Sequence, residues 1–143
     1  IRQSPTQIWR PDITLYNSAD GRFNFAEEMD SQVKVRINFD GSCAWTPPVV
    51  YNANCIMNLR TFPFDVQDCY LKFGSWTYNS NFIQLNLTGG NQSDISNYIP
   101  SISFTLAGNF VKKYNSDYSD QTTEENSQII YDEVEFHFIL KSL

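Results

Sequence analysis

The 143-residue sequence lacks most of the features that mark enzymes, membrane spans and nucleic-acid-binding proteins. It contains one histidine and no Ser-His-Asp arrangement, phosphate-binding glycine loop or paired-cysteine zinc motif, which argues against an enzyme, a metal site or a cofactor. It has no run of about 18 apolar residues, the length that a membrane-spanning helix requires, and no visible signal peptide. The net charge of −6 argues against binding to nucleic acid and mildly favours cationic ligands or ions.

Amphipathic helical patterns are also missing, whereas alternation of apolar and polar residues, which is typical of strands, recurs along the chain. In the segment 31–45 this alternation continues from Val33 to Phe39, and Asp40-Gly41 supplies a turn, which predicts a β-hairpin. Further strands are predicted at 69–73, 83–87, 102–106 and 134–140. The sequence therefore predicts an all-β fold, an antiparallel β-sandwich, with residues 1–143 forming one domain.

Two segments are expected to interrupt the strands. Gly74-Ser75 is expected to end the strand at 69–73. Lys113 to Ser127 are polar and acidic, and are expected to form a long loop of the kind that is often functional.

Three cysteines are present, and Cys55 and Cys69 flank thirteen residues that include Phe62-Pro63 and Asp65. A disulfide between the two would close a loop of fifteen residues and stabilise the fold by about 3 kcal/mol. Because only X-Pro bonds adopt cis at low cost, Phe62-Pro63 is a candidate cis peptide. Two cysteines at some spacing would by themselves be typical of an ordinary disulfide in a secreted β-domain.

The complete pattern around these cysteines resembles the signature of the Cys-loop family of pentameric ligand-gated ion channels. Its fixed positions are met here by Cys55, Met57, Leu59, Phe62, Pro63, Asp65 and Cys69. Other stretches are similar to nicotinic members: 9–12 and 15–17 to the first binding loop, 74–78 to the second, and 94–100 and 41–48 to further nicotinic segments. The resemblance implies an immunoglobulin-like sandwich of the nicotinic receptor ligand-binding-domain type, with Cys55 bonded to Cys69 and Cys43 left free.

The resemblance also implies an aromatic site between two subunits. A quaternary ammonium cannot donate a conventional hydrogen bond, so it is held by the negative faces of several aromatic rings. The principal face is expected to supply Tyr16, Trp76 and Tyr131, and the complementary face Arg36, Ala44 and Thr46. In an arbitrary β-domain Trp76 would be a core residue and Tyr131 a common surface tyrosine, while Asp12 is expected to brace the second binding loop.

The third binding loop departs from the nicotinic pattern. The positions of its aromatic residue and of its two adjacent cysteines fall on Glu124, Asn126 and Ser127. This departure leaves the agonist open, and Tyr114 or Tyr118 is a candidate replacement for the aromatic residue. The family's N-terminal helix and first strands also precede Trp9 in other members, so this chain is expected to be a fragment of the family domain.

Two further motifs concern possible glycosylation and a possible metal site. Asn86 and Asn91 begin glycosylation sequons. His137, Glu133 and Glu135 alternate along one strand and suggest either a metal site or, as we favour, a solvated strand face.

The sequence thus predicts the extracellular ligand-binding domain of a nicotinic-like, cation-selective pentameric channel at the cell surface, with subunits alike or different and a membrane channel domain C-terminal to this chain. Closure of the 113–127 loop on a cationic ligand is expected to be transmitted to the Cys55–Cys69 loop. The apolar residues Phe62 and Phe64 in that loop favour a channel, because an exposed loop tip in a soluble protein gains little from them. One alternative is a secreted, soluble pentamer resembling acetylcholine-binding proteins. Another is a β-sandwich adhesion module without a small ligand.

Overall fold

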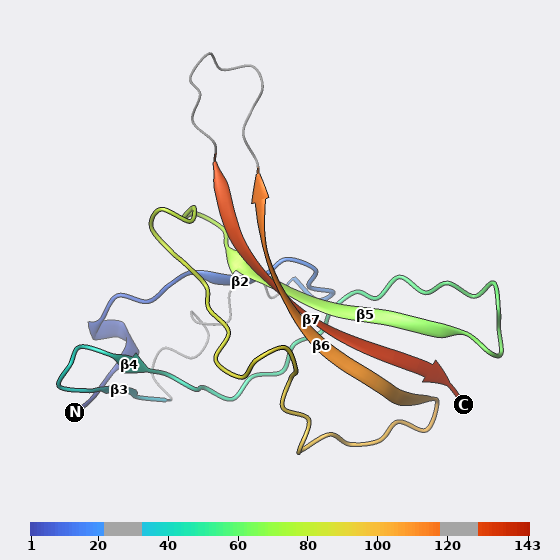
Figure 1. Cartoon of the computed structure of the whole chain (residues 1–143). Coiled ribbons are helices and arrows are strands. Elements are labelled where there is room, and N and C mark those ends of the chain that lie inside the picture. The colour runs from blue at the N-terminus through green and yellow to red at the C-terminus, as the bar shows by residue number, and fades with distance from the viewer. Residues whose placement is uncertain (22–32, 118–128) are drawn as a thin grey trace, which may run out of the picture.

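The computed structural model describes residues 1–21, 33–117 and 129–143, which form two antiparallel sheets (Figure 1). The smaller sheet has the order β1-β3-β4 and the larger the order β2-β5-β7-β6. The elements are β1 (Arg2–Gln3), the 3-10 helix η1 (Pro5–Gln7), β2 (Ile13–Leu15), β3 (Val35–Ile37), β4 (Cys43–Ala44), β5 (Val66–Ser75), β6 (Phe104–Asp117) and β7 (Ile130–Ser142). The predicted all-β, antiparallel fold class is confirmed.

The predicted hairpin is present but short. β3 and β4 pair through Arg36 opposite Ala44 and Ile37 opposite Cys43, and Gly41 takes a φ of 89° in the turn between them. Val35 is buried and Arg36 exposed, as the alternation predicts. The prediction that Phe39 continues the apolar face of the hairpin is wrong, because Phe39 lies in the turn and is fully exposed.

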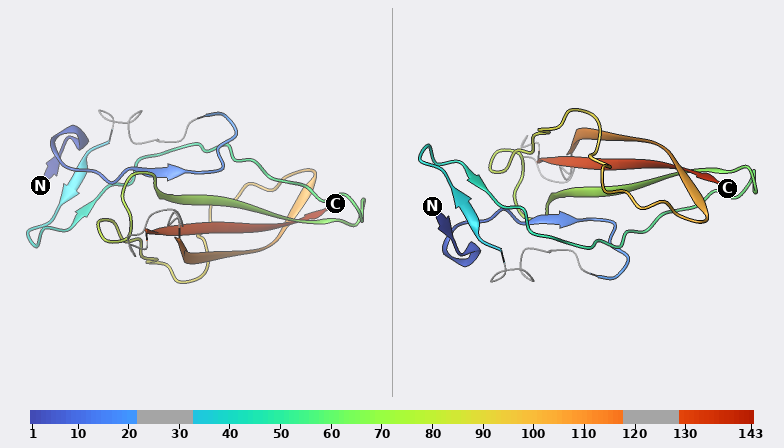
Figure 2. Two further views of the ribbon diagram at one scale, coloured as in Figure 1. Left: turned by 90° about the horizontal axis from the view of Figure 1, so that it is seen from above. Right: turned by 90° about the horizontal axis from the view of Figure 1, so that it is seen from below.

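The larger sheet is built on β5, β6 and β7. Nine residue pairs join β5 to β7, from Val66 opposite Lys141 to Gly74 opposite Glu133. The face towards the core carries apolar residues from these strands and from β2, and the buried ones among the described residues include Leu15, Val111 and Val134. The small sheet and the N-terminus lie at one end of the molecule and the C-terminus at the other (Figure 2).

Two strand predictions are wrong in detail and one is confirmed. Residues 83–87 form no strand; instead Leu85 N donates to the carboxylate of Asp132 at 3.0 Å, so a side chain takes the place of a neighbouring strand. Gly74-Ser75 are the last two residues of β5, so the predicted end of this strand before Trp76 is confirmed. β6 begins at Phe104 and extends to Asp117, so the first part of the predicted 113–127 loop is strand, and the rest lies outside the described residues.

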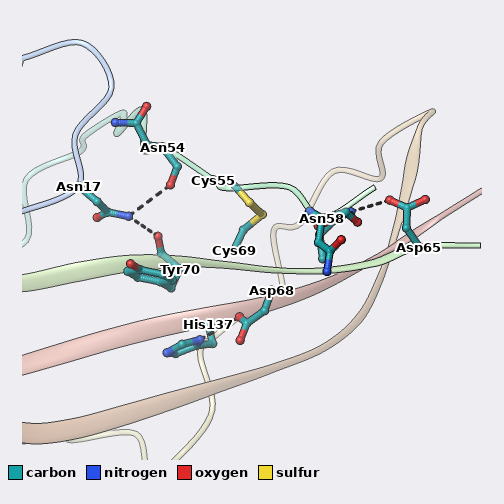
Figure 3. Close-up of a disulfide and its surroundings, with 10 residues drawn as sticks. Asn17, Asn54, Cys55, Asn58, Asp65, Asp68, Cys69, Tyr70 and His137 are labelled. Atoms are coloured by element: carbon teal, nitrogen blue, oxygen red, sulfur yellow. Dashed lines mark hydrogen bonds and ion pairs between the residues drawn. A yellow bond between two sulfur atoms is a disulfide. The ribbon is translucent and has the colours of Figure 1, made fainter. Parts of the chain in front are cut away.

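The disulfide loop lies at the end of the larger sheet where β5 begins and β7 ends, near the C-terminus of the chain. Cys55 is bonded to Cys69 with the Cα atoms 5.2 Å apart (Figure 3). The Phe62-Pro63 peptide is cis. The buried Gln67 amide donates to Asp65 Oδ2 at 2.6 Å and to Asn58 O at 3.0 Å. This donor holds the pKa of the Asp65 carboxyl below its usual value. Gln67 thereby fastens both sides of the loop to the start of β5.

Cys43 is free and exposed, as predicted. A maleimide should therefore label one thiol per chain when the protein is unfolded without reductant and three after reduction. Peptide mapping should place the single label on Cys43. A label on Cys55 or Cys69 before reduction would contradict the pairing.

Candidate functional site

A cavity of about 550 Å³ opens on the larger sheet and is lined by Tyr16, Lys72, Ser75, Trp76 and Tyr131. Tyr16 follows β2, Trp76 follows β5, and Tyr131 lies near the start of β7. The antiparallel pairing of β2 with β5 and of β5 with β7 brings the three segments to the same end of the sheet. The three predicted principal-face residues thus meet around one cavity, although they are far apart in the sequence.

The aromatic rings are held in place by hydrogen bonding and ring contacts. The Tyr16 hydroxyl donates to Ser75 O at 2.7 Å, and the Tyr16 and Trp76 ring centroids lie 5.9 Å apart in an edge-to-face arrangement. The Trp76 side chain is 72% exposed. Trp76 is therefore not a core tryptophan and presents its ring to solvent beside Tyr16.

Asp12 braces the segment that carries Trp76. Its carboxylate accepts the Ser75 hydroxyl at 2.5 Å and the Thr77 backbone N–H at 3.0 Å, while Tyr78 N donates to the Ser75 hydroxyl at 3.0 Å. Burial raises the pKa of Asp12, but the hydrogen bonds from Ser75 and Thr77 outweigh it and hold the pKa below its usual value. The bracing role predicted for Asp12 agrees with this geometry.

Lys72 forms one wall of the cavity and was missed by the sequence analysis. Its ammonium lies 3.2 Å from a Glu133 carboxylate oxygen that also accepts the Ser116 hydroxyl at 2.6 Å. It also lies 5.8 Å from the centre of the Tyr16 ring. Glu133 is completely buried. The available signal was that Lys72 lies in the strand that leads directly to Trp76, four residues before it.

The three residues predicted for the complementary face lie on the smaller sheet. Arg36 and Ala44 are opposite each other in β3 and β4, and Thr46 follows β4. Arg36 and Thr46 are exposed. The structure therefore places these residues together, and apart from the aromatic cavity on the other sheet.

Comparison with known proteins identifies the family. Residues 1–142 match the neurotransmitter-gated ion-channel ligand binding domain. The chain belongs to this family. It is accordingly a ligand-binding domain and not an enzyme.

Three relatives illustrate the similarity. The acetylcholine receptor subunit beta-type unc-29 of Caenorhabditis elegans is 45% identical over 101 residues, which are 71% of this chain and 20% of the relative. The neuronal acetylcholine receptor subunit alpha-2 of Gallus gallus is 36% identical over the whole chain and 25% of the relative. The neuronal subunit non-alpha-2 of Carassius auratus is 37% identical over the whole chain and 28% of the relative. The chain thus spans between a fifth and about a quarter of the length of these relatives.

The described residues contain no helix that is long and apolar enough to cross a membrane. Asn86 and Asn91, the two predicted glycosylation sites, are exposed. The Asn86 side chain accepts from Lys113 Nζ at 3.4 Å, and the Asn91 backbone carbonyl accepts from Val111 N at 2.7 Å. Both sites remain predictions.

The third binding loop lies outside the described residues, including Glu124, Asn126, Ser127 and Tyr118. The other candidate replacement, Tyr114, is described but does not line the cavity. Its hydroxyl donates to the Glu135 carboxylate on the neighbouring strand β7. The hypothesis that Tyr114 supplies the missing aromatic wall therefore has no support in this arrangement.

The expected solvated strand face on β7 is wrong. Glu133 is completely buried and His137 is buried, because polar partners from β5 and β6 cover them. In the described part of the chain no three His, Cys, Asp or Glu side chains are arranged to hold a metal ion.

Proposed function

We propose that this chain is the extracellular ligand-binding domain of a nicotinic-like, cation-selective pentameric channel, and that it binds a cationic, acetylcholine-like ligand at subunit interfaces. The convergence of Tyr16, Trp76 and Tyr131 on one cavity carries the proposal. The names of the relatives, which are acetylcholine receptor subunits, support the ligand class.

The chemistry of the cavity suits a cation although a lysine lines it. The ring faces of Trp76 and the two tyrosines attract a cation that cannot donate a hydrogen bond. The ammonium of Lys72 would repel such a ligand, but it is paired with the buried Glu133 carboxylate at 3.2 Å. The pair is neutral as a unit, so the aromatic rings determine the preference of the cavity.

A neighbouring copy would complete the site. The cavity lies on the larger sheet, whereas Arg36, Ala44 and Thr46 lie on the smaller sheet of the same chain. When one face of each copy meets the other face of the next, a ring can close, and every interface then contains one cavity. We propose that these three residues form the complementary wall in a pentamer of like or different subunits.

The disulfide loop favours a channel over a secreted, soluble pentamer. Phe62 and Phe64 are 69% and 85% exposed. Exposed large apolar side chains at a loop tip stabilise little in water and are typical of a contact surface. We propose that they face a membrane channel domain C-terminal to this chain, on the outer side of the plasma membrane.

The test is the effect of Trp76 substitutions on binding of a quaternary ammonium and of its uncharged isostere. Trp76→Ala should weaken binding of the cation by about 1–2 kcal/mol or more, the scale of a desolvated cation–π contact. Trp76→Phe should lose less, because a ring face remains. The uncharged isostere should be less affected by both. Calorimetry on the assembled protein measures all four differences.

Phe82→Ala is the matched control, since Phe82 is an exposed aromatic residue that does not line the cavity. It should leave both affinities unchanged. Equal losses of cation and isostere on Trp76→Ala would mean that Trp76 only packs against the ligand, and the proposed function would then be wrong.

A further inference from the structure

The face of the larger sheet that carries the cavity also carries a second polar cluster, nearer to the disulfide. Its centre is His137 in β7, whose Nδ1 lies 2.9 Å from Asp68 Oδ1 in β5. Its Nε2 lies 2.7 Å from Glu135 Oε2 in β7. Both ring nitrogens thus face carboxylates, one of them on a neighbouring strand. None of these three residues lines the aromatic cavity.

Two aromatic residues hold the imidazole ring between them. Phe110 in β6 stacks on it with ring centroids 4.4 Å apart and ring planes 7° apart. Tyr70 in β5 lies 5.4 Å away at 31°. His137 opposes both residues directly in the sheet register. Because β5 and β6 both restrict the ring, its nitrogens can reach little besides Asp68 and Glu135.

The number of protons decides whether both contacts can exist together. A carboxylate only accepts hydrogen bonds, and a neutral imidazole has one N–H, whereas an imidazolium has two. The two contacts at 2.9 and 2.7 Å therefore require the imidazolium. A neutral ring would place a lone pair against one of the carboxylates.

We propose that His137 is a proton-binding site that fastens β7 to β5 when it is charged, and that it releases Asp68 when it loses a proton. Asp68 is released and not Glu135, because the Asp68 side chain is 51% exposed and water can solvate it, whereas Glu135 is 15% exposed. Glu135 is also held by the Tyr114 hydroxyl. The neutral ring therefore keeps its proton on Nε2, towards Glu135.

The other charged groups around the cluster do not replace the charged imidazolium as the partner of Asp68 and Glu135. Lys72 in β5 and Lys112 in β6 both oppose Glu135 in the register. Lys72 is already paired with Glu133 at 3.2 Å. Burial lowers the pKa of His137, but the hydrogen bonds and charges of Asp68 and Glu135 outweigh burial and raise the pKa above its ordinary value of 6.5.

The position of Asp68 gives the proton a structural consequence. Asp68 immediately precedes Cys69, and Figure 3 shows its side chain turned towards His137 beside the disulfide. The contact stabilises the fold fully below the unfolded-state pKa, and this stabilisation is lost as the pH rises through the raised folded-state pKa. At alkaline pH the base of the disulfide loop thus loses this side-chain contact with β7, while the backbone pairing of β5 with β7 remains.

Because the chain has a single histidine, isotope labelling of histidine gives one ring signal to follow by nuclear magnetic resonance in the assembled protein. We expect a titration midpoint above 6.5 and, at alkaline pH, a neutral ring protonated on Nε2. Asp68→Asn should lower the midpoint. Asp40→Asn removes an equal charge from the distant β3–β4 turn and should leave the midpoint unchanged.

Three results would overturn the proposal: a midpoint at or below 6.5, a neutral ring protonated on Nδ1, or equal midpoints for the unmodified protein and Asp68→Asn. Thermal unfolding gives an independent measurement that does not need the variant to be fully native. The melting temperature of the unmodified protein should fall more steeply from pH 6 to pH 9 than that of His137→Gln, and equal slopes would count against the proposal.

Discussion

Lys72→Met is expected to lower the free energy of unfolding by about 3–5 kcal/mol, because it removes the Lys72 ammonium from the completely buried carboxylate of Glu133. Glu133 is completely buried, and in the described structure its charge is compensated by the Lys72 ammonium at 3.2 Å. The Ser116 hydroxyl would remain as a hydrogen-bond donor but carries no charge. Methionine keeps the unbranched chain of lysine, so the loss reflects charge and not volume. Chemical unfolding of the assembled protein measures the difference.

Two companion variants separate the buried charge from other causes. The double variant Lys72→Met/Glu133→Gln should recover most of the lost stability, because glutamine is neutral and can still accept from Ser116. Lys113→Met makes the same change on β6, where the ion pair with Asp132 is longer at 3.7 Å and Asp132 still accepts from Leu85 N. It should cost less. A loss from Lys72→Met no larger than that from Lys113→Met would contradict the argument.

Local patterns were sufficient to predict the strands that form the centre of the larger sheet. The alternation at 69–73 and at 134–140 marks the middle of β5 and β7, and the turn at Asp40-Gly41 marks the β3–β4 hairpin. These signals depend only on neighbouring residues, so the sequence carries them directly. The segment 83–87 has the same alternation but no partner strand, since Leu85 bonds to the Asp132 side chain. Alternation of apolar and polar residues shows that the two faces of a segment differ, but it does not show which group hydrogen-bonds to the backbone along its edge.

The candidate site was predictable where a motif supplied it and not where distant residues meet. Tyr16, Trp76 and Tyr131 were assigned from the resemblance, and they line one cavity. The buried charges on β7 were misjudged, because alternating Glu133, Glu135 and His137 are also typical of a solvated face. His137 and its partner Asp68 are 69 residues apart in the sequence. No local pattern predicts that register, so the burial of the charges became visible only in the paired strands.

Gly74 shows that a glycine at the end of a strand can also be required by a close side chain. Its place before Ser75 predicts the end of a strand, and it is the second-last residue of β5, opposite Glu133. A Cβ added at Gly74 would lie 2.6 Å from the Tyr16 hydroxyl and 3.1 Å from the carbonyl oxygen of Asp132. Glycine is present here because the Tyr16 side chain passes directly over the backbone of β5.

Gly74→Ala is therefore expected to destabilise the protein by about 1–3 kcal/mol, the usual cost of overpacking, and to weaken binding of a quaternary ammonium. The clash falls on the Tyr16 hydroxyl, which donates to Ser75 O at 2.7 Å and fixes the ring beside Trp76. To admit the methyl group, Tyr16 must break this hydrogen bond and move within the cavity. Chemical unfolding and calorimetry with the same ligand measure the two effects.

Gly108→Ala is the matched control, because Gly108 also lies within a strand of the larger sheet and an added Cβ there would meet nothing within 4 Å. It should change the free energy of unfolding by no more than about 0.5 kcal/mol and leave ligand affinity unaltered. If Gly74→Ala were equally silent in both measurements, Tyr16 would not be held against β5. The cavity wall on which the aromatic site depends would then be differently arranged.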